Sequence, residues 1–447
     1  MRLHEAALAL DARAVGSDVE FNAVSSDSRA LPAGCLFVAL KGPRFDGHAY
    51  AAQALREGAA AVMVAASANL DASPALVVDD TRIGLGRLAA WQRSRMPARL
   101  AAITGSNGKT TVKEMLAAIC VAAAGESAVL ATAGNLNNDI GMPLTLLKLA
   151  PQHRYAAIEM GMNHPGEIAT LSEIAHPDVA LVNNALRAHL EGLGSVAAVA
   201  RAKGEIYAGL KEGGIAIVNA DDPHADLWRK MAGGHQVLSF GFAEGADVHI
   251  TPDASRLTLK TPAGRIETPL RVPGIHNLRN AAAAAAAALA LGISVDAVAR
   301  GLAAYAGSKG RLQVHPCILG ATLIDDTYNA NPDSVAAAIQ VLAARPGLRI
   351  LVLGDMGELG ATAAALHREV GERARAAGID RLLCLGELSL NTVQGFGKGA
   401  MHFERIEELL AEIECALDVD VTVLVKGSRF MKMERVVQSF MENQTCS

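Results

Sequence analysis

The sequence predicts an α/β protein built from three domains. Its 447 residues are about three times the length of a typical domain of ~150 residues. Short apolar runs alternate with amphipathic stretches along nearly the whole chain, which is typical of α/β architecture. Hydrophobic residues make up 51% of the chain, enough to build several cores. We place the three domains at residues 1–97, 98–310 and 311–447.

The first domain is predicted to contain three strands with helices between and after them. The apolar runs at residues 35–40, 59–65 and 75–80 have the length of strands. The last helical pattern ends at Arg95, where Met96-Pro97 breaks it. The first domain boundary therefore follows Pro97.

The other two domains continue the alternation of strands and helices. In the second domain the predicted strands cover residues 98–105, 155–161, 178–184 and 214–222. The alanine-rich run 281–293 is predicted to be a buried helix, started by Asn280 and stopped near Gly292. The third domain begins near residues 310–316, and its predicted strands cover residues 321–326, 348–355, 381–387 and 420–427. Strands that alternate with helices in this way favour mainly parallel sheets.

Composition and charge argue against several classes of protein. The formal charge is -5 without a Lys/Arg-rich run, so we expect no binding of nucleic acid. The six cysteines are scattered, with no metal-binding spacing, which indicates reduced thiols. The run 281–293 is too short to span a membrane, and charged residues interrupt the N-terminal apolar stretch where a signal peptide would be apolar. We therefore expect a cytoplasmic protein without membrane insertion.

Residues 105–111 are predicted to form a compact phosphate-binding loop between a strand and a helix. The common pattern G-x-x-x-x-G-K-[ST] would need a glycine at the position of Ile103. The shorter loop still brings backbone N–H groups and the positive end of a helix, beginning around Thr111, onto an anion. Lys109 could reach the β- and γ-phosphates of a nucleotide, and the Thr110 hydroxyl could bind Mg²⁺. A glycine turn capped by threonines is the alternative, but Lys-Thr-Thr at a helix start fits ordinary capping poorly.

Three other side chains are candidates for the same site. Glu159 ends a predicted strand on the edge where parallel sheets bind ligands, so it is a candidate metal ligand. His189 lies just past the next predicted strand, although a lone histidine is more often structural. Lys203 lies in the predicted helix 196–210, where a lysine usually extends to solvent. Near a metal and with a lowered pKa, its amine could instead take up CO₂ and become a carbamate.

Residues 324–334 combine two acidic residues with a turn. Asp325 and Asp326 close a predicted strand, and an Asn-Pro turn follows. The structural interpretation is a β-turn and a helix capped at its N-terminus by Ser334. Acidic side chains and Tyr328 facing a cleft would also suit contacts with ribose and adenine.

Taken together, these stretches resemble the Mur ligase superfamily over nearly the whole chain. The resemblance rests on an ordered series of motifs: TGSNGKTT, GNLNNDIGMP, EMGMNHPGEI, AHLEGLGS, ARAKGEI, NADDP, PGIHNLRNAAAA, DDTYNANPDS, LGDMGELG and KGSRFMKMERVV. The compact TGxxGKT loop is the form that this superfamily uses, shared with folylpolyglutamate synthetases. The resemblance implies an N-terminal UDP-sugar-binding domain, a central P-loop ATPase domain and a C-terminal Rossmann-like domain that closes over the site.

The resemblance also implies roles for single residues. Lys109, His189 and Lys203 would be catalytic; Thr110 and Glu159 would hold one Mg²⁺, and His189 with carbamylated Lys203 a second. The implied ATP contacts are Gly105, Ser106, Asn107, Gly108, Lys109, Thr110, Thr111, Asn277, Asn280, Arg311, Asp326, Tyr328 and Asn331. The implied uridine-nucleotide contacts are Ser26, Asp27, Ser28, Arg29, Lys41 and His48. At Ala185-Leu186-Arg187 the family usually has smaller, less charged residues, so the sequence leaves the path of this loop open.

The activity that the resemblance implies is ATP-dependent ligation of an amine to a UDP-muramoyl peptide through an acyl phosphate, on the way to peptidoglycan. Superfamily members that add diaminopimelate or lysine carry an Asp-Asn-Pro-Arg motif, which this chain lacks. D-alanyl-D-alanine is therefore the expected amine and a UDP-muramoyl tripeptide the expected acceptor. We also expect a monomer. The alternatives are a diaminopimelate- or lysine-adding ligase, a folylpolyglutamate synthetase and a nucleotide-binding regulatory module.

The expected dipeptide site lies in two loops of the third domain, at residues 353–360 and 426–430. Both follow predicted strands, on the side of the sheet where ligands bind. The glycine spacing in the first loop is not G-x-G-x-x-G, so a dinucleotide is a poor alternative. The candidate residues are Asp355, Glu358, Lys426 and Arg429, with Lys426 or Arg429 expected to bind the terminal carboxylate.

Overall fold

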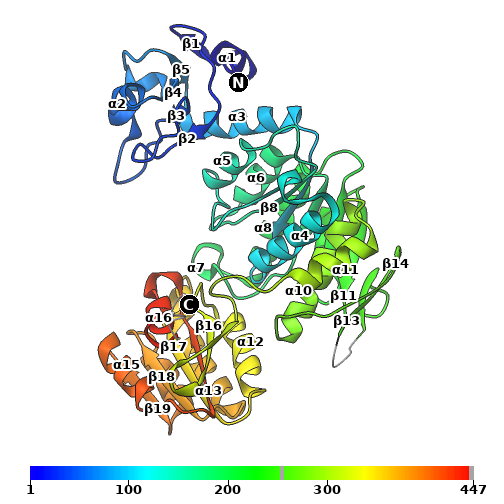
Figure 1. The fold of residues 1–447 in the computed structure, drawn as a ribbon, viewed down its shortest axis with the longest axis vertical. Coiled ribbons are helices and arrows are strands. Elements are labelled where there is room, and N and C mark those ends of the chain that lie inside the picture. Colours follow the sequence, from blue (N-terminus) through cyan, green and yellow to red (C-terminus); the bar gives the residue numbers. More distant parts are fainter. Residues whose placement is uncertain (252–255, 442–447) are drawn as a thin grey trace, which may run out of the picture.

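The computed structural model describes residues 1–251 and 256–441 and contains three β-sheets, one in each of the three predicted domains. Figure 1 shows the N-terminal domain in blue at one end, the central domain in cyan and green, and the C-terminal domain in yellow to red at the other end. The predicted three-domain α/β architecture is confirmed. Within the described residues, no helix is both long and apolar enough to cross a membrane.

The N-terminal sheet has five strands in the order β1-β5-β4-β3-β2, all parallel except β1. The strands are β1 (Arg13–Val15), β2 (Val24–Ser25), β3 (Leu36–Val38), β4 (Ala61–Ala65) and β5 (Ala75–Val78). The helices are α1 (Leu3–Leu10), η1 (Gly47–Tyr50), α2 (Ala51–Arg56), η2 (Ala66–Ala68) and α3 (Thr81–Arg95). The three predicted strands correspond to β3, β4 and β5. The sequence did not predict β1 and β2, because segments of two or three residues carry no periodic pattern.

The helix α3 connects the N-terminal domain to the central domain (Figure 1). It ends at Arg95, as predicted. Near this end the buried Arg93 side chain donates hydrogen bonds to the carbonyl of Ala98 (2.8 Å) and to the carboxylate of Asp178 (2.9 Å). The end of α3 is therefore anchored on the central sheet.

The central sheet has nine strands in the order β14-β13-β12-β11-β10-β9-β6-β8-β7. The strands are β6 (Arg99–Thr104), β7 (Val129–Ala131), β8 (Tyr155–Glu159), β9 (Val179–Val182), β10 (Ile215–Asn219), β11 (Gln236–Gly241), β12 (Val248–Thr251), β13 (Leu257–Thr261) and β14 (Gly264–Thr268). Strands β6 to β12 pair in parallel, and β13 and β14 add an antiparallel extension. The parallel part places the ends of β6, β8 and β9 at one edge, where the candidate site lies.

Helices cover both faces of the central sheet. One face packs against α4 (Lys109–Ala124), α10 (Ile275–Ala290) and α11 (Val295–Ala304). The other packs against α5 (Gly141–Leu146), α6 (Glu167–Ala175), α8 (Val196–Gly204), η4 (Glu205–Gly209) and α9 (Ala225–Met231). The short elements η3 (Glu126–Ala128) and α7 (Leu190–Leu193) lie in connections.

Two helices of the central domain start earlier than the sequence predicted. Helix α4 begins at Lys109 rather than around Thr111, directly after Gly108. Helix α10 begins at Ile275, so Asn280 lies inside it and does not start it. The reason is that Asn280 uses its side chain for hydrogen bonds within the buried core rather than to cap the helix.

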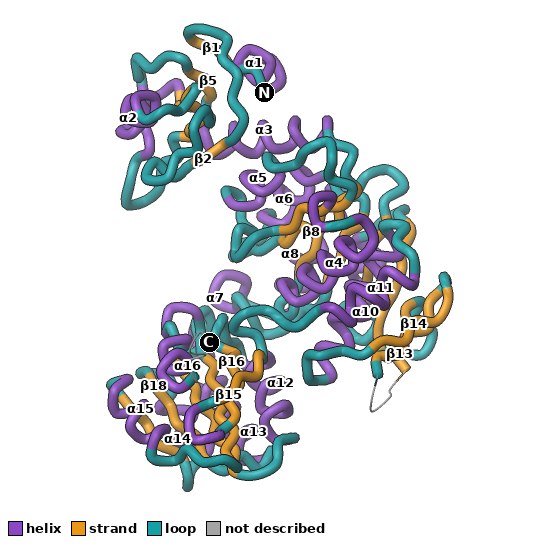
Figure 2. The backbone as a smooth tube through the Cα atoms, viewed as in Figure 1, coloured by secondary structure: helices purple, strands orange, loops and turns teal. Residues whose placement is uncertain are grey.

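The C-terminal sheet has six strands in the order β15-β16-β20-β17-β18-β19, all parallel except β15. The strands are β15 (Gln313–Pro316), β16 (Thr322–Asp326), β17 (Leu348–Gly354), β18 (Arg381–Leu385), β19 (Ala400–Phe403) and β20 (Val421–Lys426). The helices are η5 (Ile318–Gly320), α12 (Pro332–Ala343), η6 (Gly360–Thr362), α13 (Ala363–Ala376), α14 (Leu390–Phe396), α15 (Ile406–Glu414), η7 (Arg429–Met431) and α16 (Glu434–Phe440). They flank the strands on both sides (Figure 2).

The N-terminus of α12 differs from the prediction. The capping residue is Asn331, not Ser334: its side chain accepts a hydrogen bond from the Ser334 backbone N–H (2.8 Å). The Ser334 hydroxyl in turn accepts one from the Asn331 backbone N–H (3.0 Å). Because Pro332 occupies the first helical position, the capping box starts one residue before it.

Candidate active site

A cavity of about 1160 Å³ lies where the three domains meet. Its wall includes Arg82 from the N-terminal domain, the glycine loop of the central domain and Arg429 of the C-terminal domain. The glycine loop follows β6, and Glu159 ends β8, so the cavity opens at the C-terminal edge of the parallel strands. This is the edge at which α/β sheets bind ligands.

The glycine loop has a backbone shape that requires glycine at its centre. Gly108 has a φ of +78°, and a Cβ atom there would lie 2.4 Å from Oδ1 of Asn280. The Asn183 side chain donates hydrogen bonds to Oδ1 of Asn280 (3.0 Å) and to the carbonyl of Asn107 (2.9 Å). Any side chain at Gly108 would therefore displace the amides that support the loop.

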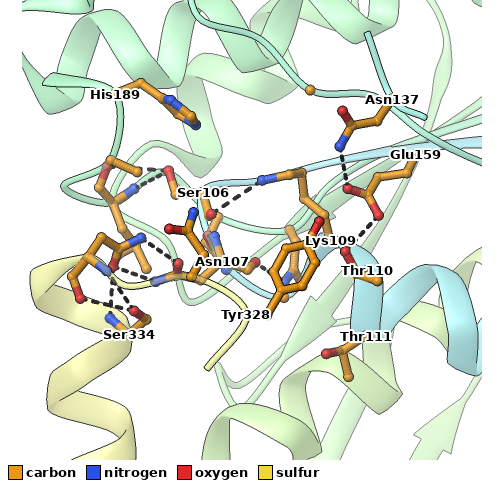
Figure 3. A pocket seen from close by; sticks show the side chains of 18 of the residues that line it. Ser106, Asn107, Lys109, Thr110, Thr111, Asn137, Glu159, His189, Tyr328 and Ser334 are labelled. Atoms are coloured by element: carbon orange, nitrogen blue, oxygen red, sulfur yellow. Dashed lines mark hydrogen bonds between the residues drawn. The ribbon is translucent and has the colours of Figure 1, made fainter. Parts of the chain in front are cut away.

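Lys109 curls over this loop at the start of α4. Its Nζ donates hydrogen bonds to the carbonyls of Gly105 (2.7 Å) and Ser106 (3.3 Å). Burial lowers the pKa of Lys109, and the charge of Glu159 opposes that shift. Figure 3 shows the Lys109 side chain extending over the loop towards Ser106.

Glu159 and Thr110 bring oxygen atoms together beside Lys109 (Figure 3). The Thr110 hydroxyl donates to Oε2 of the buried Glu159 (2.8 Å), and Arg311 Nη2 donates to the same hydroxyl (2.8 Å). Asn137 Nδ2 donates to Oε1 of Glu159 (2.7 Å). We did not predict Asn137, although it lies in the motif GNLNNDIGMP. A carboxylate and a hydroxyl are ligands of the kind that Mg²⁺ prefers.

The residues predicted to contact ATP gather at this cavity, with one exception. Those on its wall are Ser106, Asn107, Gly108, Lys109, Thr110, Thr111, Asn277, Asn280, Arg311, Asp326, Tyr328 and Asn331. Gly105 lies behind the wall, where an added Cβ would come within 2.9 Å of the Asn183 Cβ. The Arg311 guanidinium lies over the Tyr328 ring, 4.2 Å from its centroid, so a cation–π contact joins these two side chains on the wall.

His189 and Lys203 lie at different depths. His189 is on the cavity wall with a φ of +57°, and its Nδ1 lies 2.7 Å from Oε2 of Glu358. Lys203 is 1% exposed and lies behind the wall. Burial lowers the pKa of Lys203 well below its usual value, and the charge of Lys109 lowers it further. The interpretation that Lys203 extends to solvent is therefore wrong, and its amine is held in a site that favours the neutral form.

The four residues predicted for the dipeptide separate into two groups. Glu358, Lys426 and Arg429 lie on the cavity wall. However, Lys426 Nζ is buried and donates to Asp326 (2.6 Å) and to the carbonyl of Asn329 (2.8 Å). Burial explains this pairing, because an unpaired ammonium in the interior is costly.

The remaining dipeptide candidate, Asp355, is turned towards a neighbouring loop. It accepts hydrogen bonds from the backbone N–H groups of Leu388 (3.2 Å) and Ser389 (2.7 Å). Arg429, by contrast, has a side chain that is 64% exposed, and its Nη1 donates to the carboxylate of Glu434 (3.0 Å). Of the two cations predicted for the dipeptide carboxylate, Lys426 is therefore paired in the interior and Arg429 at the surface.

The residues predicted for the uridine nucleotide lie on the N-terminal domain, away from this cavity wall. They are Ser26, Asp27, Ser28, Arg29, Lys41 and His48. Both ring nitrogens of His48 have partners: Nε2 accepts from Ala65 N (3.0 Å), and Nδ1 lies 2.6 Å from Asp46. Arg29 and Asp27 form an exposed ion pair. The roles of these residues in binding remain predictions.

The described residues do not bring three or more His, Cys, Asp or Glu side chains together as a metal site. Glu159 and the Thr110 hydroxyl are the protein oxygens that would hold a metal beside the phosphate loop, with a bound phosphate nearby. This is the usual arrangement for Mg²⁺ at phosphate-transfer sites.

A glycine loop of the phosphate-binding kind, an acidic strand end beside it and a cavity lined by three domains are features expected of an ATP-dependent ligase. Three family models match the chain in order. They describe the Mur ligase family catalytic domain (residues 20–104), the Mur ligase middle domain (103–288) and the Mur ligase glutamate ligase domain (310–429). The chain belongs to the Mur ligase family, as its motifs predicted.

Named relatives and solved structures agree with this membership. The chain is 48% identical to the UDP-N-acetylmuramoyl-tripeptide–D-alanyl-D-alanine ligase of Escherichia coli (strain K12), over 96% of both chains. It is 44% identical to the enzyme of the same name from Haemophilus influenzae, over 98% of this chain and 97% of the other. A crystal structure of MurF from Acinetobacter baumannii superposes with a TM-score of 0.91 at 36% identity, covering 98% of both chains. MurF from Thermotoga maritima in complex with ADP gives 0.82 at 29% identity, covering 93% of this chain and 96% of the other.

Proposed function

We propose that the chain is an ATP-dependent ligase that joins D-alanyl-D-alanine to UDP-N-acetylmuramoyl-tripeptide, giving the pentapeptide precursor of peptidoglycan, ADP and phosphate. The observation that carries the proposal is the shared cavity, where the phosphate loop lies between the N-terminal domain and the exposed Arg429 of the C-terminal domain. One substrate from each end of the molecule can meet ATP there. Because the domains of a single chain complete this cavity, we further propose that the enzyme acts as a monomer. We also propose, from its sequence, that it acts in the cytoplasm.

The proposed reaction has two steps. The terminal carboxylate of the tripeptide attacks the γ-phosphorus of ATP, the bond to ADP breaks, and an acyl phosphate forms. The amine of the dipeptide then adds to the acyl carbon, loses a proton, and phosphate leaves. Lys109 would neutralise the charge of the phosphoryl group during transfer. This chemistry needs no side-chain nucleophile. The enzyme has only to position the substrates and stabilise the charge that develops on the transferred phosphoryl group.

Magnesium fits the site that Glu159 and Thr110 form, because both offer oxygen atoms beside the phosphate loop. His189 and carbamylated Lys203 would support a second ion. The low pKa that burial gives Lys203 supports this proposal, because only a neutral amine takes up CO₂. Bound Mg²⁺ would supply charge neutralisation on the phosphate oxygens.

For the dipeptide, we propose that Arg429 binds the terminal carboxylate. A guanidinium can hold a carboxylate with two hydrogen bonds. Lys426 is the weaker candidate because its pair with Asp326 is buried, whereas the pair of Arg429 with Glu434 is exposed. Glu358, which pairs with His189 on the cavity wall, would bind the dipeptide amine.

The test is a substrate panel assayed with UDP-N-acetylmuramoyl-tripeptide and MgATP, in which phosphate release and the peptide product are both measured. D-alanyl-D-alanine should be consumed, while diaminopimelate, lysine and glutamate should not. Extension of a UDP-muramoyl dipeptide with diaminopimelate or lysine would contradict the proposed substrates. ATP hydrolysis independent of both substrates would favour a nucleotide-binding regulatory module.

A further inference from the structure

The loop between β9 and α7, residues 183–189, is attached to the phosphate loop along its length. The Ser106 N–H donates to the carbonyl of Asn184 (3.0 Å), and the Leu186 N–H donates to the Ser106 hydroxyl (2.9 Å). The Asn107 N–H donates to Oδ1 of Asn184 (2.9 Å). The same loop ends at His189 on the cavity wall. Its position therefore fixes both the back of the phosphate loop and His189.

Arg187, in the middle of this loop, points to the C-terminal domain. Its backbone N–H (2.9 Å) and Nη2 (2.6 Å) donate to the carboxylate of Asp333 on α12. Its Nη1 donates to both oxygens of Glu369 on α13 (2.8 and 3.0 Å). One guanidinium thus holds two carboxylates from two helices, a geometry that lysine cannot reproduce.

A second contact joins the same helix to the phosphate loop. The side-chain amides of Asn107 and Asn331 exchange hydrogen bonds (2.7 and 3.3 Å), and Asn331 caps α12 two residues before Asp333. Figure 3 shows Asn107 facing the yellow helix α12, which carries Ser334. The start of α12 therefore contacts the phosphate loop and the β9–α7 loop together.

The contact continues beyond Arg187. The Glu191 backbone N–H donates to the carbonyl of Glu358 (3.2 Å), and the Glu358 carboxylate lies beside His189. Figure 1 shows α7, which belongs to the central domain, against the C-terminal domain. His189 is thus placed by a loop that the C-terminal domain holds on both sides of it.

We propose that Arg187 is a positioning residue that couples closure of the C-terminal domain to the placement of His189 and the phosphate loop. When the C-terminal domain is docked, Asp333 and Glu369 hold Arg187 and so hold the loop that carries His189. When it swings away, Arg187 loses both carboxylates and the loop loses its support. The effect on ligation rests on the proposed function, whereas the effect on domain arrangement does not.

The proposal predicts which substrate is affected when Arg187 is replaced. The dipeptide loops belong to the C-terminal domain, so dipeptide binding requires docking. The UDP-linked substrate is expected on the N-terminal and central domains, where docking matters less. Arg187→Gln should therefore raise KM for D-alanyl-D-alanine on the order of tenfold, since couplings of this kind change affinity about 5- to 150-fold. The Kd for the UDP-linked tripeptide should stay within about twofold of the wild-type value.

The experiment measures domain arrangement and kinetics on the same variants. Small-angle X-ray scattering, with a non-hydrolysable ATP analogue and the UDP-linked tripeptide bound, should give a larger radius of gyration for Arg187→Gln than for wild type. Glu369→Gln, which leaves Arg187 intact, should shift both readouts in the same direction, and its effect should not add to that of Arg187→Gln. Arg187→Lys should restore only part of the loss. Arg349→Gln is the matched control, because Arg349 pairs with Asp380 inside the C-terminal domain (2.8 Å) and should leave both readouts unchanged.

Wild-type scattering and wild-type kinetics for both Arg187→Gln and Glu369→Gln would overturn the proposal. Strictly additive effects, or an equal effect of Arg349→Gln, would also overturn it, because the link across the domains would then carry no coupling. A wild-type enzyme that does not ligate D-alanyl-D-alanine would contradict the proposed function instead, and the scattering comparison would still decide the role of Arg187.

Discussion

Replacing Lys109 by alanine should nearly abolish turnover while the fold stays intact. The ammonium is held over the phosphate loop by the carbonyls of Gly105 and Ser106, where we expect the transferred phosphoryl group to lie. A unit charge about 4 Å away, at an effective dielectric constant of 20, is worth roughly 4 kcal/mol. Mutagenesis of comparable electrostatic contacts gives about 3 kcal/mol or more. The barrier should therefore rise by about 3–4 kcal/mol, which lowers kcat roughly 150- to 1000-fold.

The assay is single-turnover phosphate release at saturating substrates, with ATP affinity and thermal unfolding measured in parallel. Lys211→Ala is the matched control, because Lys211 pairs with Asp178 away from the cavity and should turn over normally. If Lys109→Ala stays within tenfold of wild type and binds ATP normally, the loop does not hold the transferred phosphate. A variant that unfolds at lower temperature than Lys211→Ala would instead indicate that the two carbonyl contacts stabilise the loop.

Three more predictions follow from buried groups. Lys203→Ala should be nearly inactive, and short carboxylic acids should partly restore activity if a carbamate supplies the missing anion; an active alanine variant would exclude the carbamate. Lys426→Met should lower the free energy of unfolding, measured with urea, by about 3–5 kcal/mol, because it leaves Asp326 buried without its partner. Adding Asp326→Leu to that variant should recover most of the loss. Burial lowers the pKa of His367, whose Nε2 accepts a hydrogen bond from the Met356 N–H (3.0 Å). Below about pH 6.5 the unfolded chain therefore takes up a proton that the folded chain does not, so the free energy of unfolding decreases as the pH falls. His367→Gln should reduce the dependence of the urea unfolding midpoint on pH between pH 7.5 and 5.5. The same pH dependence in the variant and in wild type would contradict this.

The parts of the fold that the sequence predicts are those with a local cause. The apolar run that forms β6 leads directly into the glycine loop. Gly108 in that loop has a positive φ, a conformation that favours glycine. Glu159 could be placed at the sheet edge because it ends a strand of an alternating α/β pattern. Strand β14, in contrast, mixes exposed and buried residues in five positions, and its antiparallel pairing depends on a partner strand rather than on its own pattern.

The parts that could not be predicted depend on contacts between distant residues. Arg187 binds carboxylates that are 146 and 182 positions further along the chain, so its sequence neighbours say nothing about them. The sequence predicts Lys426 as a cation available to a ligand. In the structure it forms an ion pair with Asp326, 100 positions earlier, because β16 and β20 are adjacent. The same pairing changes what the dipeptide site can contain. A charge that adjacent strands bury in a pair is already neutralised, so we expect a carboxylate ligand to bind an exposed cation such as Arg429, whose pairing with Glu434 lies at the surface.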